Sequence, residues 1–262
     1  MATCVIAVIG AAPCQCFSPG GNHTTSPGRK PLNFAGLLEQ IDHIRSALSA
    51  RSLGRGDRVA VLAGRGPEAA TAAIGVACSA VCVPMNPNSK TAELEQALST
   101  VRAKALLVPG EAPTAARQAA ANIGLSLIEG LIAPDAPAGR FQLDGAHARI
   151  GEAVEADDLA LILRTSGSTA QPKVVPITHR TLVAVCAKGQ RLFNLGPTER
   201  CLNLMPLCYQ HGLGAGLMVP IAAGGSAICP PHFDLETFVV CVRELGPTWY
   251  TAGFTYHQAI LE

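Results

Sequence analysis

The sequence predicts a layered α/β protein with largely parallel β-sheets. Short runs of aliphatic and β-branched residues alternate with helical stretches of about ten or more residues, an order typical of parallel strands joined by right-handed crossovers. Hydrophobic residues make up 48% of the 262 residues but aromatic residues only 4%, so we expect a core of small aliphatic side chains between closely packed elements. This length suffices for one large domain or two small ones.

An irregular leader is predicted over residues 1–30, followed by a folded domain over residues 31–262. The segment FSPGGNHTTSPGRKP, at 17–31, is rich in residues that favour turns and loops. The first twelve residues are largely apolar, and small residues precede Pro13, as in a signal peptide. A signal peptide also needs a basic amino-terminal region, and no lysine or arginine precedes Arg29. No stretch reaches the roughly eighteen apolar residues of a membrane-spanning helix. These features favour a cytoplasmic protein.

The first predicted helix covers residues 34–51. Its apolar residues recur at steps of four, three and four, which places them on one helical face: Leu37, Ile41, Ile44 and Leu48. A buried strand, RVAVLAG at 58–64, follows. Pro67 and Glu68 suit the first turn of the next helix, because proline lacks the N–H that is unpaired there and an acid favours the positive helix end.

The remaining elements are expected to alternate in the same way. Strands are predicted at 81–84, 104–108, 125–128, 159–163, 173–177, 201–205, 226–229 and 248–252. Helices are predicted at 91–101, 112–123 and 234–244, and from Thr178, His211 and Phe254 onward. Residues 129–156 read as a connection that contains one short strand at 140–143. The order implies mostly parallel pairing.

Charge and cysteine content exclude several classes of function. A formal net charge of +1 with 15% charged residues does not favour a nucleic-acid partner. The ten cysteines form no pair of CxxC motifs, so we expect no metal site and interpret most of them as buried free thiols in a reducing compartment. Cys14 and Cys16 together supply only half of a tetrahedral site.

One polar loop, RTSGSTAQPK at 164–173, follows the strand LALIL at its expected carboxyl end, where parallel sheets commonly bind ligands. Its hydroxyls, its exposed backbone amides and its ammonium suit phosphate oxygens. The candidate phosphate-binding residues are Thr165, Ser166, Gly167, Ser168, Thr169 and Lys173. The loop is not the common GxxxxGK[ST] motif. The alternative is a Ser/Thr-rich turn without a chemical role.

The string LILRTSGSTAQPKVVPITHRTL resembles the signature of the adenylate-forming superfamily, which includes acyl-CoA synthetases, luciferases and peptide-synthetase adenylation domains. Three further passages resemble the family in the same order: PLNFAGLLEQIDHIRSALSARSLGRGDRVAVL, PEAATAAIGVACSAVCVPMNPN and MPLCYQHGLGAGLMVPIAAGGSAICPPHFD. The resemblance covers residues 31–262. It implies an incomplete N-terminal domain of an adenylate-forming enzyme, nearest to the acyl-CoA synthetases.

The resemblance also implies a reaction. Such enzymes activate a small carboxylic acid with ATP and Mg²⁺, release pyrophosphate, and usually transfer the acyl group to coenzyme A. The polar loop would hold the β- and γ-phosphates, and its donors would stabilise the charge that develops on pyrophosphate. His211 would lie on the carboxylic-acid side of the site. The neighbouring GLGAG does not match GxGxxG and is interpreted as a close-packed helix start.

Three residues depart from the family pattern around the loop. Arg164 replaces an aromatic residue, Ala170 replaces the second glycine and Val174 replaces the glycine after the lysine. Alanine in the left-handed conformation that glycine tolerates costs about 1–2 kcal/mol, so the loop is expected to follow a different path or to bind phosphate less tightly. His179 is expected to help begin the next helix, with Thr178 as its N-cap.

The family's base-binding turn, ribose-binding aspartate and C-terminal catalytic lysine have no counterpart in this sequence. We therefore assign no catalytic residue and expect the chain alone to be inactive, with the rest of the domain as its partner. Exposed apolar helix faces and an unpaired strand edge would then make it poorly soluble. Two alternatives remain: part of a peptide-synthetase adenylation domain, or a non-catalytic remnant that acts as a binding module.

Overall fold

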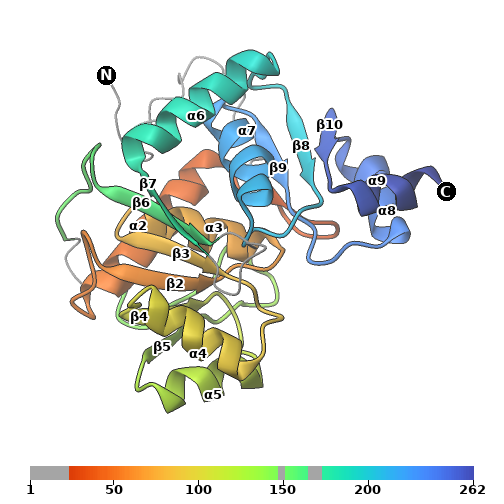
Figure 1. Ribbon diagram of the computed structural model, residues 1–262. Helices are drawn as coiled ribbons and strands as arrows, with labels where there is room; N and C mark the ends of the chain where they lie inside the picture. The colour runs from red at the N-terminus through yellow and green to blue at the C-terminus, as the bar shows by residue number, and fades with distance from the viewer. Residues whose placement is uncertain (1–23, 147–150, 165–172) are drawn as a thin grey trace.

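The computed structural model describes residues 24–146, 151–164 and 173–262, and within these ranges it contains two β-sheets (Figure 1). The larger sheet has the strand order β5-β4-β2-β3-β6-β7. Its strands are β2 (Arg58–Leu62), β3 (Val81–Met85), β4 (Ala105–Val108), β5 (Ser126–Glu129), β6 (Leu159–Arg164) and β7 (Val174–Thr178). The smaller sheet has the order β1-β9-β8-β10. Its strands are β1 (Thr24–Thr25), β8 (Arg200–Asn203), β9 (Ser226–Ile228) and β10 (Trp249–Thr251).

Helices cover both sheets and form a third layer between them. The helices are α2 (Phe34–Ser49), α3 (Pro67–Ala77), α4 (Thr91–Thr100), α5 (Thr114–Asn122), α6 (His179–Leu192), the π-helix η2 (His211–Met218), α7 (Val219–Ala222), α8 (Leu235–Leu245) and α9 (Phe254–Leu261). The main core joins α2, α3, α6, η2 and α7 to one face of each sheet. Helices α4 and α5 cover the other face of the larger sheet. Helix α8 packs on the other face of the smaller sheet.

The predicted helical face of α2 is confirmed. Leu37, Ile41, Ile44 and Leu48 are all buried against the main core. Gly75 of α3 lets that helix approach closely, because a Cβ there would lie 3.1 Å from the Cβ of Ile44. Pro67 and Glu68 occupy the first turn of α3, as predicted. The small residues of the sequence therefore serve close helix packing.

The pairing of β7 differs from the parallel pattern that the sequence predicts. β7 runs antiparallel to β6, with Arg164 opposite Val174. The other paired strands of both sheets are parallel. Residues 165–173 connect β6 to β7, and a parallel crossover needs about a dozen residues or more. β6 and β7 therefore form an antiparallel pair at the edge of the sheet, and residues 165–172 of the candidate phosphate loop lie outside the described residues.

Two shorter segments also differ from expectation. The predicted strand at 140–143 is only an isolated bridge between Leu131 and Gln142. The end of the predicted leader forms β1, which pairs with β9 through Thr24 and Ala227. Residues 1–23 of that leader lie outside the described residues. None of the described helices is long and apolar enough to cross a membrane.

Candidate functional site

The carboxyl ends of the two sheets face each other across a junction of loops. The amide of Leu207, after β8, donates a hydrogen bond to the carbonyl oxygen of Gly64, after β2, over 2.7 Å. Arg65 donates from Nη1 to the carbonyl oxygen of Leu204. Strands β2, β3 and β6 are parallel, so Arg164 at the end of β6 lies on this same edge of its sheet. Open parallel sheets commonly bind ligands at such an edge.

Arg164 and Lys173 flank the candidate phosphate loop. Thr165, Ser166, Gly167, Ser168 and Thr169 lie outside the described residues, as does Ala170. Lys173 directly precedes β7 and is exposed. The Nε atom of Arg164 is buried without a hydrogen-bond partner, and burial lowers the pKa of its guanidinium. The two ends of the loop thus bring two cationic side chains to the edge of the sheet.

His211 begins η2, and its ring meets the end of β10. Its Nε2 lies 2.5 Å from the hydroxyl oxygen of Thr251, which is the last residue of β10. Thr251 is buried, whereas His211 is exposed. The carboxyl end of the smaller sheet therefore holds the predicted substrate-side histidine with its imidazole partly open to solvent.

Asn203, at the end of β8, supports the helix turn that carries His211. Its side-chain amide donates to the carbonyl oxygen of Gly212 over 2.9 Å, and its carbonyl oxygen accepts from the amide of Met205 over 3.1 Å. A Cβ on Gly212 would lie 2.8 Å from the carbonyl oxygen of Met205, and one on Gly216 would lie 2.7 Å from Nδ2 of Asn203. The interpretation of GLGAG as a close-packed helix start is confirmed.

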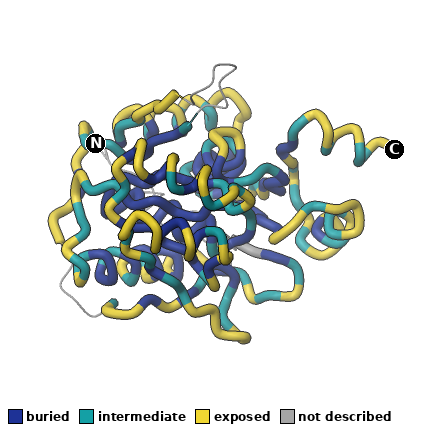
Figure 2. Tube along the Cα trace, turned by 60° about the horizontal axis from the view of Figure 1, so that its bottom comes forward, coloured by how far each residue is buried: buried dark blue, intermediate teal, exposed yellow. Residues whose placement is uncertain are grey.

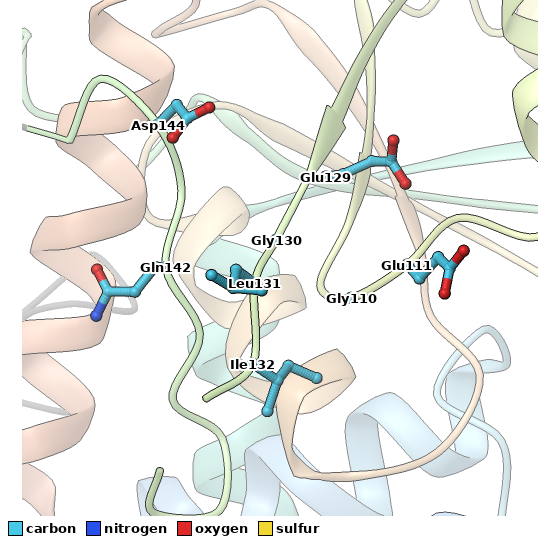
Figure 3. A pocket seen from close by; sticks show the side chains of 8 residues that line it. All are labelled: Gly110, Glu111, Glu129, Gly130, Leu131, Ile132, Gln142 and Asp144. Atoms are coloured by element: carbon cyan, nitrogen blue, oxygen red, sulfur yellow. The ribbon is translucent and has the colours of Figure 1, made fainter. Parts of the chain in front are cut away.

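Two hollows open at the carboxyl edge of the larger sheet. The smaller, of about 220 Å³, is lined by Gly64, Arg65, Asn86, Pro87, Asn88, Pro206, Tyr209 and Pro231, which come from the ends of both sheets. The larger, of about 610 Å³, lies at the ends of β4 and β5 (Figure 3). Its Glu129 already accepts from Arg117 and from the amide of Ala112. We therefore place the candidate site beside the smaller hollow, where loops from both sheets meet.

His179 lies away from solvent and is not part of this edge. It is the first residue of α6, and Thr178 caps that helix by accepting a hydrogen bond from the amide of Thr181, as predicted. Both ring nitrogens of His179 are buried without partners, and burial lowers its pKa, partly opposed by the charge of Asp158. The lowered pKa favours the neutral imidazole. Its position at the amino end of α6 indicates a structural role.

The described residues contain no group of three or more histidine, cysteine, aspartate or glutamate side chains placed to hold a metal ion. The seven described cysteines are buried and form no disulfide, which confirms the expectation of buried thiols at these positions: Cys78, Cys82, Cys186, Cys201, Cys208, Cys229 and Cys241. The pair Cys14 and Cys16 lies outside the described residues.

A family model described as AMP-binding enzyme matches residues 19–262. The chain belongs to this family. An AMP-binding relative, a probable CoA ligase of Humulus lupulus, is 32% identical over 90% of this chain and 46% of its own length. A sulfoacetate–CoA ligase of Cupriavidus necator is 31% identical over 89% of this chain and 45% of its own length. The predicted resemblance to the branch of the family that contains CoA ligases is thereby confirmed.

The fold of the chain matches solved structures. The crystal structure of ATP-bound MatB from Rhodopseudomonas palustris superposes with a TM-score of 0.84 at 24% identity, over all of this chain and 51% of that one. Another relative, a phenyloxazoline synthase of Mycolicibacterium paratuberculosis, is 33% identical over 69% of this chain and 14% of its own length. The chain spans about half the length of the CoA ligases it matches.

Four residues of the chain were not predicted as part of the site: Arg65, Asn203, Thr251 and Tyr256. Each lies at or just beyond the carboxyl end of an observed strand, or in the first turn after one. The sequence predicted strand ends close to Arg65 and Thr251, whereas it placed Asn203 in the middle of the predicted strand 201–205. The pairing of β10 with β8, which brings Thr251 beside His211, connects strands far apart in the chain and could not be inferred from local pattern.

Proposed function

We propose that the protein containing this chain activates a small carboxylic acid with ATP, forms an acyl-adenylate with release of pyrophosphate, and transfers the acyl group to coenzyme A. The observation that carries the proposal is the position of the sequence RTSGSTAQPK in a chain of the AMP-binding family. Its first and last residues, Arg164 and Lys173, lie at the carboxyl edge of a mostly parallel sheet. That edge also carries the end of β3, and it faces the end of β8.

The residues take separate roles in this proposal. Thr165, Ser166, Gly167, Ser168, Thr169 and Lys173 hold the β- and γ-phosphates. Their hydroxyl, amide and ammonium donors stabilise the negative charge that grows on pyrophosphate as it leaves. His211 contacts the carboxylic acid. Mg²⁺ accompanies the ATP phosphates, and one or two carboxylates together with phosphate oxygens suffice to hold it.

Coenzyme A is the favoured acceptor because several of the similar relatives are named as CoA ligases or CoA synthases, and two of the ligases match about nine-tenths of this chain. A phenyloxazoline synthase and an isonitrile lipopeptide synthase match 69% and 84% of it, so a carrier protein is the alternative acceptor. We expect this chain alone to bind ATP without completing adenylation, because the other half of the relatives' length would supply the base pocket and the catalytic lysine. Acyl transfer to CoA or to a carrier protein, measured with the longer protein, distinguishes the two acceptors.

Binding of ATP and pyrophosphate by this chain tests the phosphate site directly, by isothermal titration calorimetry. Loss of a hydrogen bond to a charged group costs about 1.5–3 kcal/mol. We therefore expect Lys173→Ala to weaken binding about 10- to 100-fold. The matched control is Lys188→Ala, an exposed lysine on α6, which should leave the Kd unchanged.

Exchange of labelled pyrophosphate into ATP tests the chemistry. With the longer protein we expect exchange that depends on an added acid, and the acids to try first are those named for the relatives: oxalate, sulfoacetate and ferulate. Exchange by this chain alone, reduced by Lys173→Ala, would show that the chain is sufficient. Equal ATP affinity in Lys173→Ala and Lys188→Ala would remove the proposed phosphate site.

A further inference from the structure

Arg65 joins the loop after β2 to the end of β8 and to helix α9. Its Nη1 donates to the carbonyl oxygen of Leu204, directly after β8, and its Nη2 donates to the hydroxyl of Tyr256 over 2.7 Å. The guanidinium carbon also lies 5.3 Å from the centre of the Tyr256 ring. A planar guanidinium can stack on an aromatic ring and donates its hydrogen bonds from a rigid fork, whereas the ammonium of lysine is a compact charge without a plane to stack.

The contact with Arg65 adds to the anchorage of α9. No residue of α9 is fully buried, and only Tyr256 and Ile260 pack, partly buried, against the core of the smaller sheet. Tyr256 lies in its first turn, where its amide donates to the carbonyl oxygen of Gly253 over 3.0 Å. Its ring also meets the edge of Phe233, with ring centres 4.6 Å apart. Tyr256 thus fixes the start of α9 from two sides.

The segment that Arg65 fixes is the same segment that holds His211. The amide of Leu204 donates to the carbonyl oxygen of Thr251 over 3.0 Å, while the carbonyl oxygen of Leu204 accepts from Arg65. Tyr256 follows Thr251 after a connection of only a few residues. Arg65 therefore contacts Leu204, which is bonded to Thr251, and Tyr256, which follows Thr251 in the chain. The hydroxyl of Thr251 is the group bonded to the ring of His211.

We propose that Arg65 is a positioning residue for His211: by holding Leu204 and Tyr256 it fixes Thr251, which keeps the imidazole in one orientation at the junction of the two sheets. The consequence for binding the carboxylic acid rests on the proposed function. Arg65 acts through other residues and is not itself a catalytic residue. The physical reason is that Arg65 ties the start of α9, which has no fully buried residue, to the backbone directly after β8.

The side-chain resonances of His211 test this arrangement without any ligand or activity. Imidazole ¹⁵N and ¹³C chemical shifts at one fixed pH report which ring nitrogen carries the proton and how the ring is bonded. His211→Gln assigns the signal. Thr251→Val removes the direct hydrogen bond and defines the full displacement. We expect Arg65→Met to displace the His211 signals in the same direction and by a comparable amount.

The matched control is Arg58→Met. Arg58 stands at the opposite end of β2 and donates from Nη1 to the carbonyl oxygen of Val101 over 2.8 Å, so its loss removes a similar bond far from His211. Arg58→Met should leave the His211 signals in place. Tyr256→Phe removes one oxygen from a half-buried ring, and it is expected to give a smaller displacement than Arg65→Met.

The proposal is overturned if Arg65→Met and Tyr256→Phe both leave His211 unchanged, or if Arg58→Met displaces it equally. Should Arg65→Met not fold, as judged by urea unfolding, Tyr256→Phe alone decides between the outcomes. Failure of the proposed function gives a different pattern, because the longer protein would lack acid-dependent exchange while the His211 displacements persisted. If both hold, Arg65→Met raises the KM for the acid in the longer protein and leaves the KM for ATP nearly unchanged.

Discussion

The side-chain amide of Asn203 donates a hydrogen bond to the carbonyl oxygen of Gly212, with 2.9 Å between the two atoms. Asn203 is only 3% exposed, and its other polar atom accepts from the amide of Met205. Asn203 is the last residue of β8, and both polar atoms of its side chain form hydrogen bonds. It therefore links the end of β8 to the turn that carries His211. The smaller sheet and the candidate site are therefore built around one polar side chain.

Replacing Asn203 by leucine should strongly destabilise the chain. The change keeps a similar volume but leaves the amide of Met205 without its acceptor and removes the second hydrogen bond at the carbonyl oxygen of Gly212; a buried unpaired group costs about 1–3 kcal/mol. Urea denaturation measures the loss of unfolding free energy. Asn122→Leu is the control, because Asn122 is exposed and water can replace its contacts. Equal effects of the two changes would mean that Asn203 has no special role.

Gly214 and Gly216 should respond to alanine with opposite signs. A Cβ on Gly216 would lie 2.7 Å from Nδ2 of Asn203, whereas a Cβ on Gly214 would meet nothing within 4 Å. Alanine in place of an unhindered helical glycine stabilises by roughly 0.5–1 kcal/mol. Overpacking a well-filled site costs typically about 1–3 kcal/mol. We expect Gly214→Ala to raise and Gly216→Ala to lower the urea midpoint. The same sign for both would contradict this packing.

The alternation of strands and helices was predictable because each element carries its own periodic pattern. The face of α2 with Leu37 and Ile41 is an example, since burial of a helix face follows from residue spacing alone. The direction of β7 was not predicted, although the short connection from Arg164 to Val174 contained the necessary information. The isolated bridge near Gln142 shows the limit of local pattern, because pairing there depends on a distant partner.

The chemistry of the site was predictable only where it lies within one motif. His211 was identified from its own passage, and its exposure at the carboxyl edge agrees with a ligand-facing role. Thr251 and Arg65 were missed because their importance arises from tertiary contacts, which no local pattern encodes. Whether Ser166 and its neighbours bind phosphate stays a prediction, since they lie outside the described residues.

The unfolding free energy should fall as the pH falls below the usual pKa of histidine, about 6.5. Burial lowers the pKa of His179 in the folded chain, so the unfolded chain takes up a proton first. The contribution is therefore fully present above the unfolded pKa and is lost as the pH falls toward the folded pKa. The unfolding free energy, measured by urea denaturation at several pH values across this range, should depend less steeply on pH in His179→Leu than in the wild type. His257→Gln, at an exposed position, should keep the original slope.

The described cysteines should resist thiol reagents in the native chain. Burial raises the pKa of Cys186 and of Cys229 to about 12, and that of Cys208 to about 11, which leaves very little reactive thiolate at neutral pH. We expect alkylation of these three residues to be slow in buffer and rapid in concentrated urea. Mass spectrometry of digested protein measures each site. Rapid native labelling of Cys229, which is 2% exposed, would contradict the packing of β9.

Helix α8 is apolar on two faces, although only one of them packs on the smaller sheet. Cys241 is buried there, and Phe238 packs beside it. The other face exposes Leu235, Val239 and Val242, each 45–48% accessible. These residues recur at steps of four and three and so form one stripe. In Figure 2 the end of the chain that contains α8 is largely exposed. An exposed apolar stripe of this kind favours association.

Self-association through this stripe should be removable without loss of stability. The triple change Leu235→Gln, Val239→Gln and Val242→Gln is expected to lower the mass found by analytical ultracentrifugation at high concentration. It should change the unfolding free energy by no more than about 0.5 kcal/mol per surface substitution. The control is Leu131→Gln with Ile132→Gln, two exposed residues beside the larger hollow. A wild-type chain that stays monomeric and unfolds cooperatively would show that the stripe does not drive association, because the variant would then have nothing to correct.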